Sequence, residues 1–113
     1  MISGVGIDVV DIDRFDRTLK RTPSLKSKLF TEAERIESIQ SLAARFAAKE
    51  ALIKALNAEN AILWHEEEVT NLEGGKPVFI FYGAVADLVG SADVHLSISH
   101  VSGIATAIVI VEH

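Results

Sequence analysis

The order of sequence patterns predicts an α+β fold, in which an antiparallel sheet packs with one long helix and two or three shorter helices. Two observations carry this prediction. Helical patterns follow a single opening strand, and strand patterns joined by short turns fill most of the second half. Helices grouped before most of the strands favour separate layers over alternating β-α-β units. The 113 residues suit a single domain, 1–113.

The first half is expected to be mostly helical after one strand. Residues 3–10 alternate between apolar side chains and glycine or aspartate, which predicts a strand. Helical spacing of apolar residues predicts a helix over 12–21 that ends before a proline. Thr31 and Glu34 have the spacing of a capping box, which predicts a further helix from Thr31 toward Gln40.

The remaining elements follow in order. An alanine-rich helical pattern predicts the long helix over 42–56. Residues 62–71 and 78–82 are expected to be strands joined by a glycine-containing turn, and 84–89 a short helix. Two apolar segments around a Ser-Gly turn predict a final hairpin with strands over 94–100 and 104–111.

The composition excludes several classes of protein. Without cysteine there is no disulfide framework, thiolate zinc site or cysteine nucleophile. The most apolar stretch, 104–111, is far shorter than the roughly 18–20 residues of a membrane helix. The N-terminus carries Asp8 and no basic lead-in, which is not typical of a signal peptide, so we expect a cytoplasmic protein. A net charge of −5 argues against nucleic acid as the partner.

A basic segment interrupts this acidic chain. Residues 14–28 contain six basic residues and one acid, a local charge of +5 that leaves −10 on the other 98 residues. Helical spacing brings together Arg14, Arg17, Arg21 and Lys28. The segment is either a solvated helix face or a docking site for an acidic protein or a polyphosphate.

Asp8 is the first candidate for chemistry. It shares a strand face with Gly4 and Gly6, so its carboxylate lies beside bare backbone that a ligand can approach closely. The alternative is an acid at the strand end that caps the next helix, a role for which Asp11 and Asp13 are also candidates.

Two charged i,i+4 pairs lie in the long helix: Arg45 with Lys49, and Glu50 with Lys54. They are either surface pairs of little energetic value, or charges on a buried helix that need a partner or a ligand. Three bases around one acid suit phosphate groups bridged by a metal. Asp8 and Glu50 together offer two carboxylates from different elements, which suits Mg²⁺ and points to phosphoryl or phosphodiester transfer.

Other polar residues are less informative. His65 and His113 are expected to face solvent, and His95 lies in a strand. His100 precedes a turn, where it either reaches a ligand or is a structural turn residue. The glutamates at 66–68 indicate a solvated strand edge. The sequence has no P-loop, dinucleotide fingerprint, zinc spacing or Ser/His triad.

The segments together resemble the 4′-phosphopantetheinyl transferases, most closely their short, stand-alone class, the holo-[acyl-carrier-protein] synthases. The resemblance spans the whole chain, and its most specific parts are Gly6-Ile7-Asp8 and Lys49-Glu50-Ala51 with Lys54. The segments that agree in order and approximate spacing are Phe30-Thr31-Glu32-Ala33-Glu34, Arg45-Phe46-Ala47-Ala48, Trp64 leading to Glu68-Val69, Gly74-Gly75-Lys76-Pro77 and Leu96-Ser97-Ile98-Ser99-His100.

The resemblance implies an enzyme that moves the 4′-phosphopantetheine arm of coenzyme A to a serine of apo acyl carrier protein. It releases adenosine 3′,5′-bisphosphate and supports fatty acid biosynthesis. In this family Mg²⁺ is held at the positions of Asp8 and Glu50, and catalysis is assigned to these two residues and Lys54. The implied contacts with coenzyme A are Arg45, Lys49, Lys54, Gly75, Lys76, Pro77 and His100. The general base stays open.

The family also implies partners. Its members dock the acidic acyl carrier protein on the helix after the first strand, which assigns that role to Arg14, Arg17, Arg21 and Lys28. The resemblance also implies a homotrimer with active sites at its subunit interfaces. His100 is therefore expected to serve the site of a neighbouring subunit. A hydrophobic content of 49%, high for so small a domain, suits a subunit that buries one face.

One segment departs from the family. Residues 56–63 are short and lack the glycine-containing loop that family members usually carry there, so no contact of that loop is carried over. A non-catalytic module that binds coenzyme A or an acidic protein is the alternative to the enzyme, and a small structural trimer is a third reading. The presence of Asp8, Glu50 and Lys54 favours the enzyme.

Overall fold

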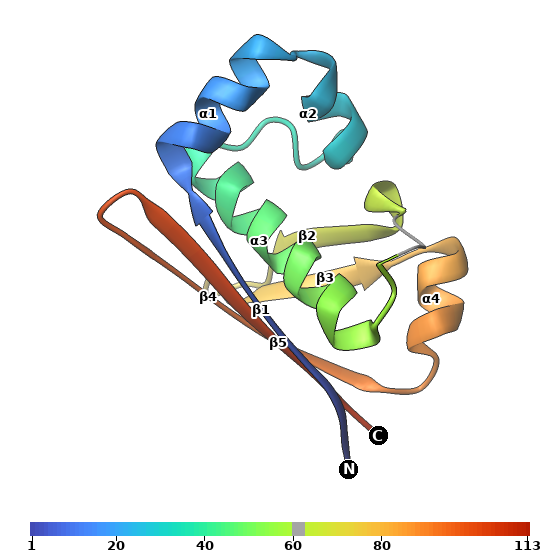
Figure 1. The fold of residues 1–113 in the computed structure, drawn as a ribbon. Helices are drawn as coiled ribbons and strands as arrows, with labels where there is room; N and C mark the ends of the chain where they lie inside the picture. The colour runs from blue at the N-terminus through green and yellow to red at the C-terminus, as the bar shows by residue number, and fades with distance from the viewer. Residues whose placement is uncertain (60–62) are drawn as a thin grey trace.

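The computed structural model describes residues 1–59 and 63–113, and the described part has the predicted α+β class (Figure 1). Its strands are β1 (Ile2–Asp11), β2 (Glu67–Asn71), β3 (Pro77–Phe81), β4 (Asp93–Val101) and β5 (Ile104–Glu112). Its helices are α1 (Ile12–Arg21), α2 (Ser24–Leu29), α3 (Ile39–Leu56), α4 (Gly83–Val89) and a short 3₁₀ turn, η1 (Trp64–Glu66).

The strands form two antiparallel sheets, one with the order β1-β5-β4 and one that pairs β2 with β3. Helix α3 lies along the three-stranded sheet, and α1 and α2 lie beyond its N-terminal end (Figure 1). The two chain termini meet at the opposite end, where the amide of His113 donates to the carbonyl of Met1 at 2.8 Å. The C-terminal hairpin is confirmed: β4 is one residue longer at each end than predicted, and β5 is one residue longer at its C-terminal end.

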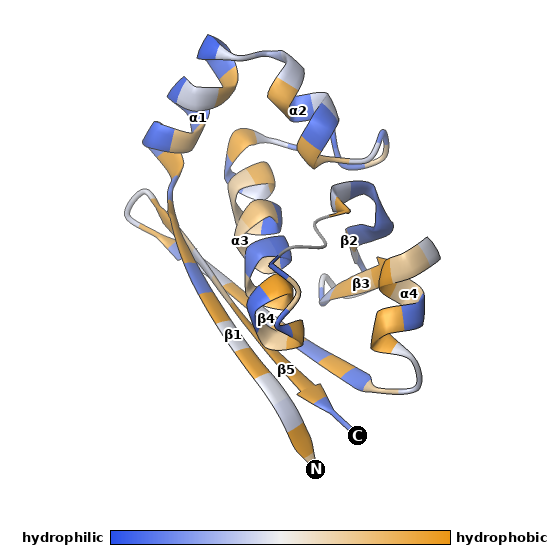
Figure 2. Ribbon diagram, turned by 45° about the vertical axis from the view of Figure 1, so that its right-hand side comes forward, coloured by the Kyte–Doolittle hydropathy of each residue, from blue (hydrophilic) through white to orange (hydrophobic). Residues whose placement is uncertain are grey.

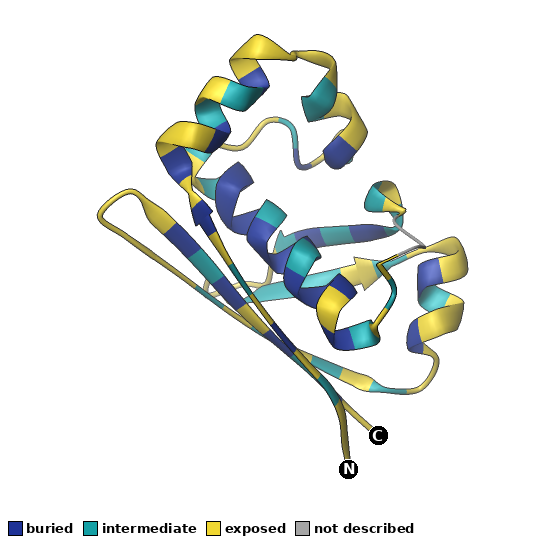
Figure 3. Cartoon of the chain, viewed as in Figure 1, coloured by how far each residue is buried: buried dark blue, intermediate teal, exposed yellow. Residues whose placement is uncertain are grey.

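The core lies between α3 and the three-stranded sheet. Alternate residues of β5, from Ala105 to Val111, are buried in this core, whereas Ile104 and Ile108 are exposed on the opposite face of the sheet. The hydropathy of β1 also alternates (Figure 2), but its apolar side chains Val5, Ile7 and Val9 lie on the exposed face. Helix α3 is buried on most sides (Figure 3), because β1, β5, β2 and α1 all contact it. Charged side chains on this helix therefore need partners inside the fold.

The prediction of a helix from Thr31 is wrong, although its capping box forms. The amide of Thr31 donates to Glu34 Oε1 at 2.9 Å, and the amide of Glu34 donates to Thr31 Oγ1 at 3.4 Å. The chain then turns, because the Glu34 carboxylate also binds Lys49 in the core, and α3 begins only after Ser38. The missed helix is α2, which starts directly after Pro23.

The strand predicted over 62–71 is shorter than expected. Residue 62 lies outside the described residues, residues 64–66 form η1, and β2 begins at Glu67. At the end of α3, Asn57 adopts the left-handed conformation with φ 53°, the backbone geometry that glycine most often supplies at a helix C-terminus.

Candidate functional site

Two glycines allow β1 to lie directly on α3. A Cβ atom on Gly6 would lie 1.8 Å from the carbonyl oxygen of Ala51, and one on Gly4 would lie 1.8 Å from that of Ala55. Only glycine permits so close an approach of two backbones. Asp8 is the next residue on the same face of β1, so this contact places its carboxylate beside α3.

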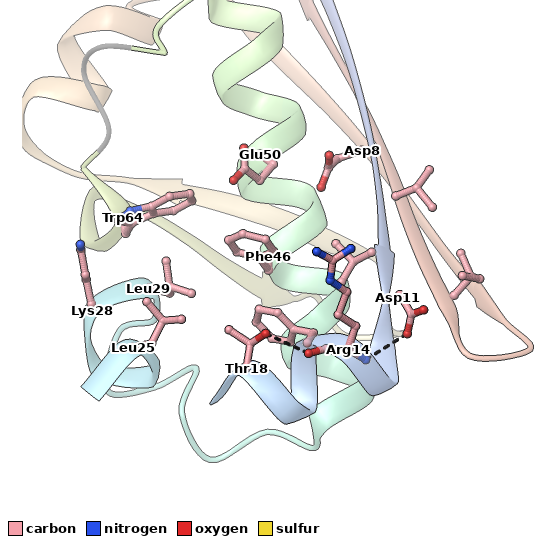
Figure 4. A pocket seen from close by; sticks show the side chains of 14 residues that line it. Asp8, Asp11, Arg14, Thr18, Leu25, Lys28, Leu29, Phe46, Glu50 and Trp64 are labelled. Carbon is pink, nitrogen blue, oxygen red and sulfur yellow. Dashed lines mark hydrogen bonds between the residues drawn. The ribbon is translucent and has the colours of Figure 1, made fainter. Parts of the chain in front are cut away.

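Asp8, Glu50 and Lys54 meet at this contact. Lys54 Nζ lies 3.2 Å from Asp8 Oδ1 and donates to the carbonyl of Ile7 at 2.9 Å. The carboxylates of Asp8 and Glu50 lie over the same groove (Figure 4). Burial raises the pKa of Glu50, the negative charge of Asp8 raises it further, and Lys54 offsets part of this rise. A cation bound between the carboxylates would relieve their repulsion.

A groove with a volume of about 890 Å³ extends from these carboxylates. A row of three aromatic rings contributes to its wall: Phe46 stacks on Phe15 with ring centroids 5.0 Å apart, and its ring centroid is 5.7 Å from that of Trp64. No pattern in the sequence predicted this aromatic wall. The other apolar lining residues are Val9, Val10, Leu25, Leu29 and Ile104.

The basic helices form another side of the groove. Arg14 and Lys28 line it, with the side chain of Arg14 extending from α1 into the groove (Figure 4), whereas Arg17 and Arg21 are exposed elsewhere on α1. The cap of α1 is Asp11, whose Oδ1 accepts from the amide of Arg14 at 3.0 Å. The helix-cap alternative for Asp8 is therefore wrong.

Arg45 and Lys49 are not an exposed surface pair. Arg45 is 7% exposed, and its guanidinium donates to the carbonyl of Val69 at 3.2 Å and to Asn71 Oδ1 at 3.0 Å. Lys49 is fully buried, and its ammonium lies 2.6 Å from Glu34 Oε1. Neither residue is among the described residues that line the groove.

The other predicted coenzyme A contacts lie outside the groove of a single chain. Gly75 and Lys76 form the turn between β2 and β3, and Pro77 begins β3. Asn71 joins this turn to Arg45, since its Nδ2 donates to the carbonyl of Gly75 at 2.9 Å. His100 is exposed near the end of β4, opposite Ala105 of β5. One chain thus groups Asp8, Glu50 and Lys54 but does not bring the turn or His100 to them.

The interpretation of the glutamates at 66–68 as a solvated strand edge is wrong. Glu67 is 2% exposed, and its Oε1 has no hydrogen-bond partner in the described part of the chain. Burial raises the pKa of Glu67 to about 9. Glu66 Oε1 accepts from the amide of Val85 at 3.0 Å, and Glu68 accepts from the hydroxyl of Thr31 at 2.5 Å. These side chains join elements of the fold.

The two predicted metal ligands, Asp8 and Glu50, both line the groove. Residues 1–59 and 63–113 contain no cluster of three or more histidine, aspartate or glutamate side chains suited to a metal. Two carboxylates that open onto a groove nonetheless fit Mg²⁺, which commonly binds one or two carboxylates and fills its remaining positions with water and substrate phosphates. Across the same two ranges, no helix has the length and apolar character needed to span a membrane.

Known proteins similar to this chain share its whole length. Residues 4–109 match the model of the 4′-phosphopantetheinyl transferase superfamily. A holo-[acyl-carrier-protein] synthase of Leifsonia xyli is 51% identical over 115 residues, which cover 99% of this chain and 98% of that protein.

Solved structures agree with this match. An ACPS–CoA complex from Chronobacterium ammoniagenes has a TM-score of 0.87 and 31% identity, covering 97% of this chain and 96% of its own. A holo-[acyl-carrier-protein] synthase from Neisseria meningitidis has a TM-score of 0.91 and 29% identity, covering 100% of both chains. The chain therefore belongs to the 4′-phosphopantetheinyl transferase superfamily.

Proposed function

We propose that this chain is a holo-[acyl-carrier-protein] synthase, which transfers 4′-phosphopantetheine from coenzyme A to a serine of apo acyl carrier protein. The observation that carries the proposal is the meeting of Asp8, Glu50 and Lys54 at a groove bordered by basic side chains of α1 and α2. The 51% identity to a holo-[acyl-carrier-protein] synthase over nearly the whole chain supports it. The reaction takes place in the cytoplasm and supplies fatty acid biosynthesis.

Asp8 and Glu50 hold Mg²⁺ in this proposal. When bound there, the ion neutralises the charge of the coenzyme A pyrophosphate. Lys54, whose side chain is 48% exposed, adds a second positive charge beside Asp8 and contacts the same phosphates. Arg45, the turn at 75–77 and His100 contribute to the nucleotide end of the coenzyme.

The transfer is a substitution at phosphorus. The serine Oγ of the carrier forms a bond to the β-phosphorus, and the bond from that phosphorus to the bridging oxygen breaks. Adenosine 3′,5′-bisphosphate leaves with the bridging oxygen, and the serine proton passes to water or to a carboxylate of the site. Since such reactions depend mainly on positioning and charge neutralisation, the fixed contact between β1 and α3 is the main contribution of the fold.

The acidic carrier protein docks on the basic segment. Arg14 and Lys28 lie in the groove itself, and Arg17 and Arg21 extend the positive charge along α1. Opposite charges on the two partners steer association and make its rate depend on salt concentration. The same surface therefore brings the carrier serine to the groove.

The enzyme is a homotrimer with active sites at its subunit interfaces. The face of the three-stranded sheet away from α3 supports this proposal, because it carries exposed apolar side chains: Val5 is 57% exposed, Ile7 58% and Val9 61%. Contact between copies through this face would bury them. In such an assembly His100 serves the site of a neighbouring subunit.

Mass spectrometry of apo acyl carrier protein, incubated with the chain, coenzyme A and Mg²⁺, tests the proposal. We expect a gain equal to the phosphopantetheine mass, which disappears when either Asp8→Asn or Glu50→Gln replaces the wild-type chain. Absence of the gain with the wild-type chain, together with coenzyme A binding in calorimetry, would instead support the non-catalytic binding module.

A further inference from the structure

Lys49 and Glu50 are neighbours on α3 but lie in opposite environments. Glu50 lines the groove, whereas the side chain of Lys49 has no exposed surface. A buried ammonium is costly unless all of its protons are hydrogen-bonded. The contacts that satisfy Lys49 therefore indicate why a lysine is buried there.

The ammonium of Lys49 binds three oxygens from three separate segments. It lies 2.6 Å from Glu34 Oε1 in the turn after Thr31, 2.8 Å from the carbonyl of Leu29 at the end of α2, and 3.0 Å from the carbonyl of Trp64 in η1. The ammonium carries three donors, and its three oxygen partners match that number.

Two of these three segments supply one part of the groove's apolar lining, formed by Leu29 and Trp64 and called the Leu29–Trp64 wall. Within this wall, Trp64 lies against Phe46 of α3. Glu34 extends the same connection to β2, because its Oε2 accepts from the amide of Val69 at 2.9 Å. A single charge on α3 thus holds α2 and η1 at a fixed place relative to Glu50, the next residue on the helix.

We propose that Lys49 is a positioning residue for the transfer reaction, which sets the distance of the Leu29–Trp64 wall from Glu50. This inference deepens the proposed function and rests on it. It replaces the direct contact with coenzyme A that the sequence analysis expected of Lys49. Because Leu29 and Trp64 line the same groove as Glu50 and Lys28, the position of the wall governs how the carrier protein enters the groove.

The test uses the full chain and the intrinsic fluorescence of Trp64, the single tryptophan. The double variant Lys49→Met/Glu34→Gln removes both members of the buried pair, which leaves no unpaired charge inside the fold. We expect it to fold, with Trp64 emission shifted to longer wavelength and more strongly quenched by acrylamide. The KM for acyl carrier protein should rise about tenfold, equivalent to about 1.4 kcal/mol of lost binding, with kcat and the KM for coenzyme A largely unchanged.

Glu67→Gln is the matched control, because Glu67 belongs to the same buried cluster but makes no hydrogen bond to Leu29 or Trp64 in the described part of the chain. Its emission and KM values should equal those of the wild-type chain. Unchanged emission and kinetics in the folded double variant would overturn the inference, since Lys49 would then serve stability alone. A selective rise in the KM for coenzyme A with unchanged emission would overturn it in favour of a phosphate contact.

Should the double variant fail to fold, Glu34→Gln alone carries the test, because it removes the charge that anchors the Lys49 ammonium against the carbonyls of Leu29 and Trp64. A smaller shift in the same directions supports the inference, and none contradicts it. Complete absence of transfer by the wild-type chain would defeat the proposed function instead. The emission of Trp64 would still show whether Lys49 sets the wall.

Discussion

Two regions of the molecule combine carboxylates with a lysine, and burial separates their roles. In the interior, Lys49 lies between Glu34 and Glu67, and all three side chains are nearly inaccessible. At the groove, Lys54 lies beside Asp8 and near Glu50, and its side chain is 48% exposed. The same residue types thus form a structural cluster on one side of α3 and a candidate reaction centre on another.

The difference shows why sequence spacing alone does not assign a charged residue. Lys49 and Lys54 belong to the same helical motif, and both were expected to face phosphate groups. Helix α3 is covered on most sides, so each charge faces a different neighbour. The ammonium of Lys54 lies beside Asp8 of β1, whereas that of Lys49 lies beside Glu34 in the turn after Thr31.

The largest expected difference between the two regions is the effect of substitutions on the rate of transfer. If the proposed function holds, Asp8→Asn and Glu50→Gln should each lower the rate of phosphopantetheine transfer about 1000-fold, since each removes a charge proposed to hold the ion against the pyrophosphate. Burial and Asp8 raise the pKa of Glu50, so its ionised form opposes folding at neutral pH. The free energy of unfolding of Glu50→Gln, measured with urea, should therefore equal or exceed that of the wild-type chain. A large loss of stability would contradict the assignment.

The interior cluster should respond in the opposite way. Lys49→Met removes the partner of the buried Glu34 side chain, and we expect a loss of about 3–5 kcal/mol in the free energy of unfolding. The matched control is Lys54→Met, which removes a half-exposed ion pair and should cost no more than about 1 kcal/mol. Equal losses in both variants would remove the distinction between the two regions.

The stability of the interior cluster should also depend on pH through Glu67. Its pKa is about 9 in the folded chain against an ordinary value of 4.5, so the folded chain keeps a proton that the unfolded chain loses between these pH values. The contribution is fully present below about pH 4.5 and is lost as pH rises toward 9.

Glu67→Gln keeps the side chain neutral and should remove this decline. Comparison of urea unfolding at about pH 6 and about pH 9 measures it, with the exposed Glu73→Gln as control. A decline with pH that is as steep in Glu67→Gln as in the wild-type chain would show that Glu67 is ionised in the folded protein.

The smallest expected effect concerns docking at the groove. Arg14→Glu should raise the KM for acyl carrier protein about tenfold and weaken its dependence on salt, with the KM for coenzyme A unchanged. Lys20→Glu is the matched control, because it makes the same change of charge on α1 at a residue that pairs with Asp16 and does not line the groove. Equal effects of the two variants would show that docking depends on the overall charge of α1 and not on the position of Arg14 in the groove.

Local patterns predicted most of the fold. Alternation identified β1, two apolar segments around a turn identified the C-terminal hairpin, and helical periodicity identified α1 and α3. The helix expected from Thr31 is one of the exceptions: its capping box forms, but Glu34 binds Lys49, fifteen positions later in the chain. No local pattern contains such a contact, so propensity favoured a helix that tertiary structure prevents.

The site was predicted in part. The glycines before Asp8 and the position of Glu50 and Lys54 on one helix were sufficient to expect a pair of carboxylates with a lysine. The burial of Glu67, and the aromatic wall that includes Trp64, depend on how η1 and β2 pack against α3. That packing joins segments from both halves of the chain. The periodicity of a single sequence predicts local elements but not contacts between distant segments.

The central claim is that Glu50 belongs to the reaction centre and Lys49 to its support. The most direct test measures transfer at saturating coenzyme A and acyl carrier protein by two folded variants, Glu50→Gln and Lys49→Met/Glu34→Gln. We predict that kcat is nearly abolished in the first and largely retained in the second. Retention of kcat by Glu50→Gln, or its loss in the folded double variant, would contradict the account.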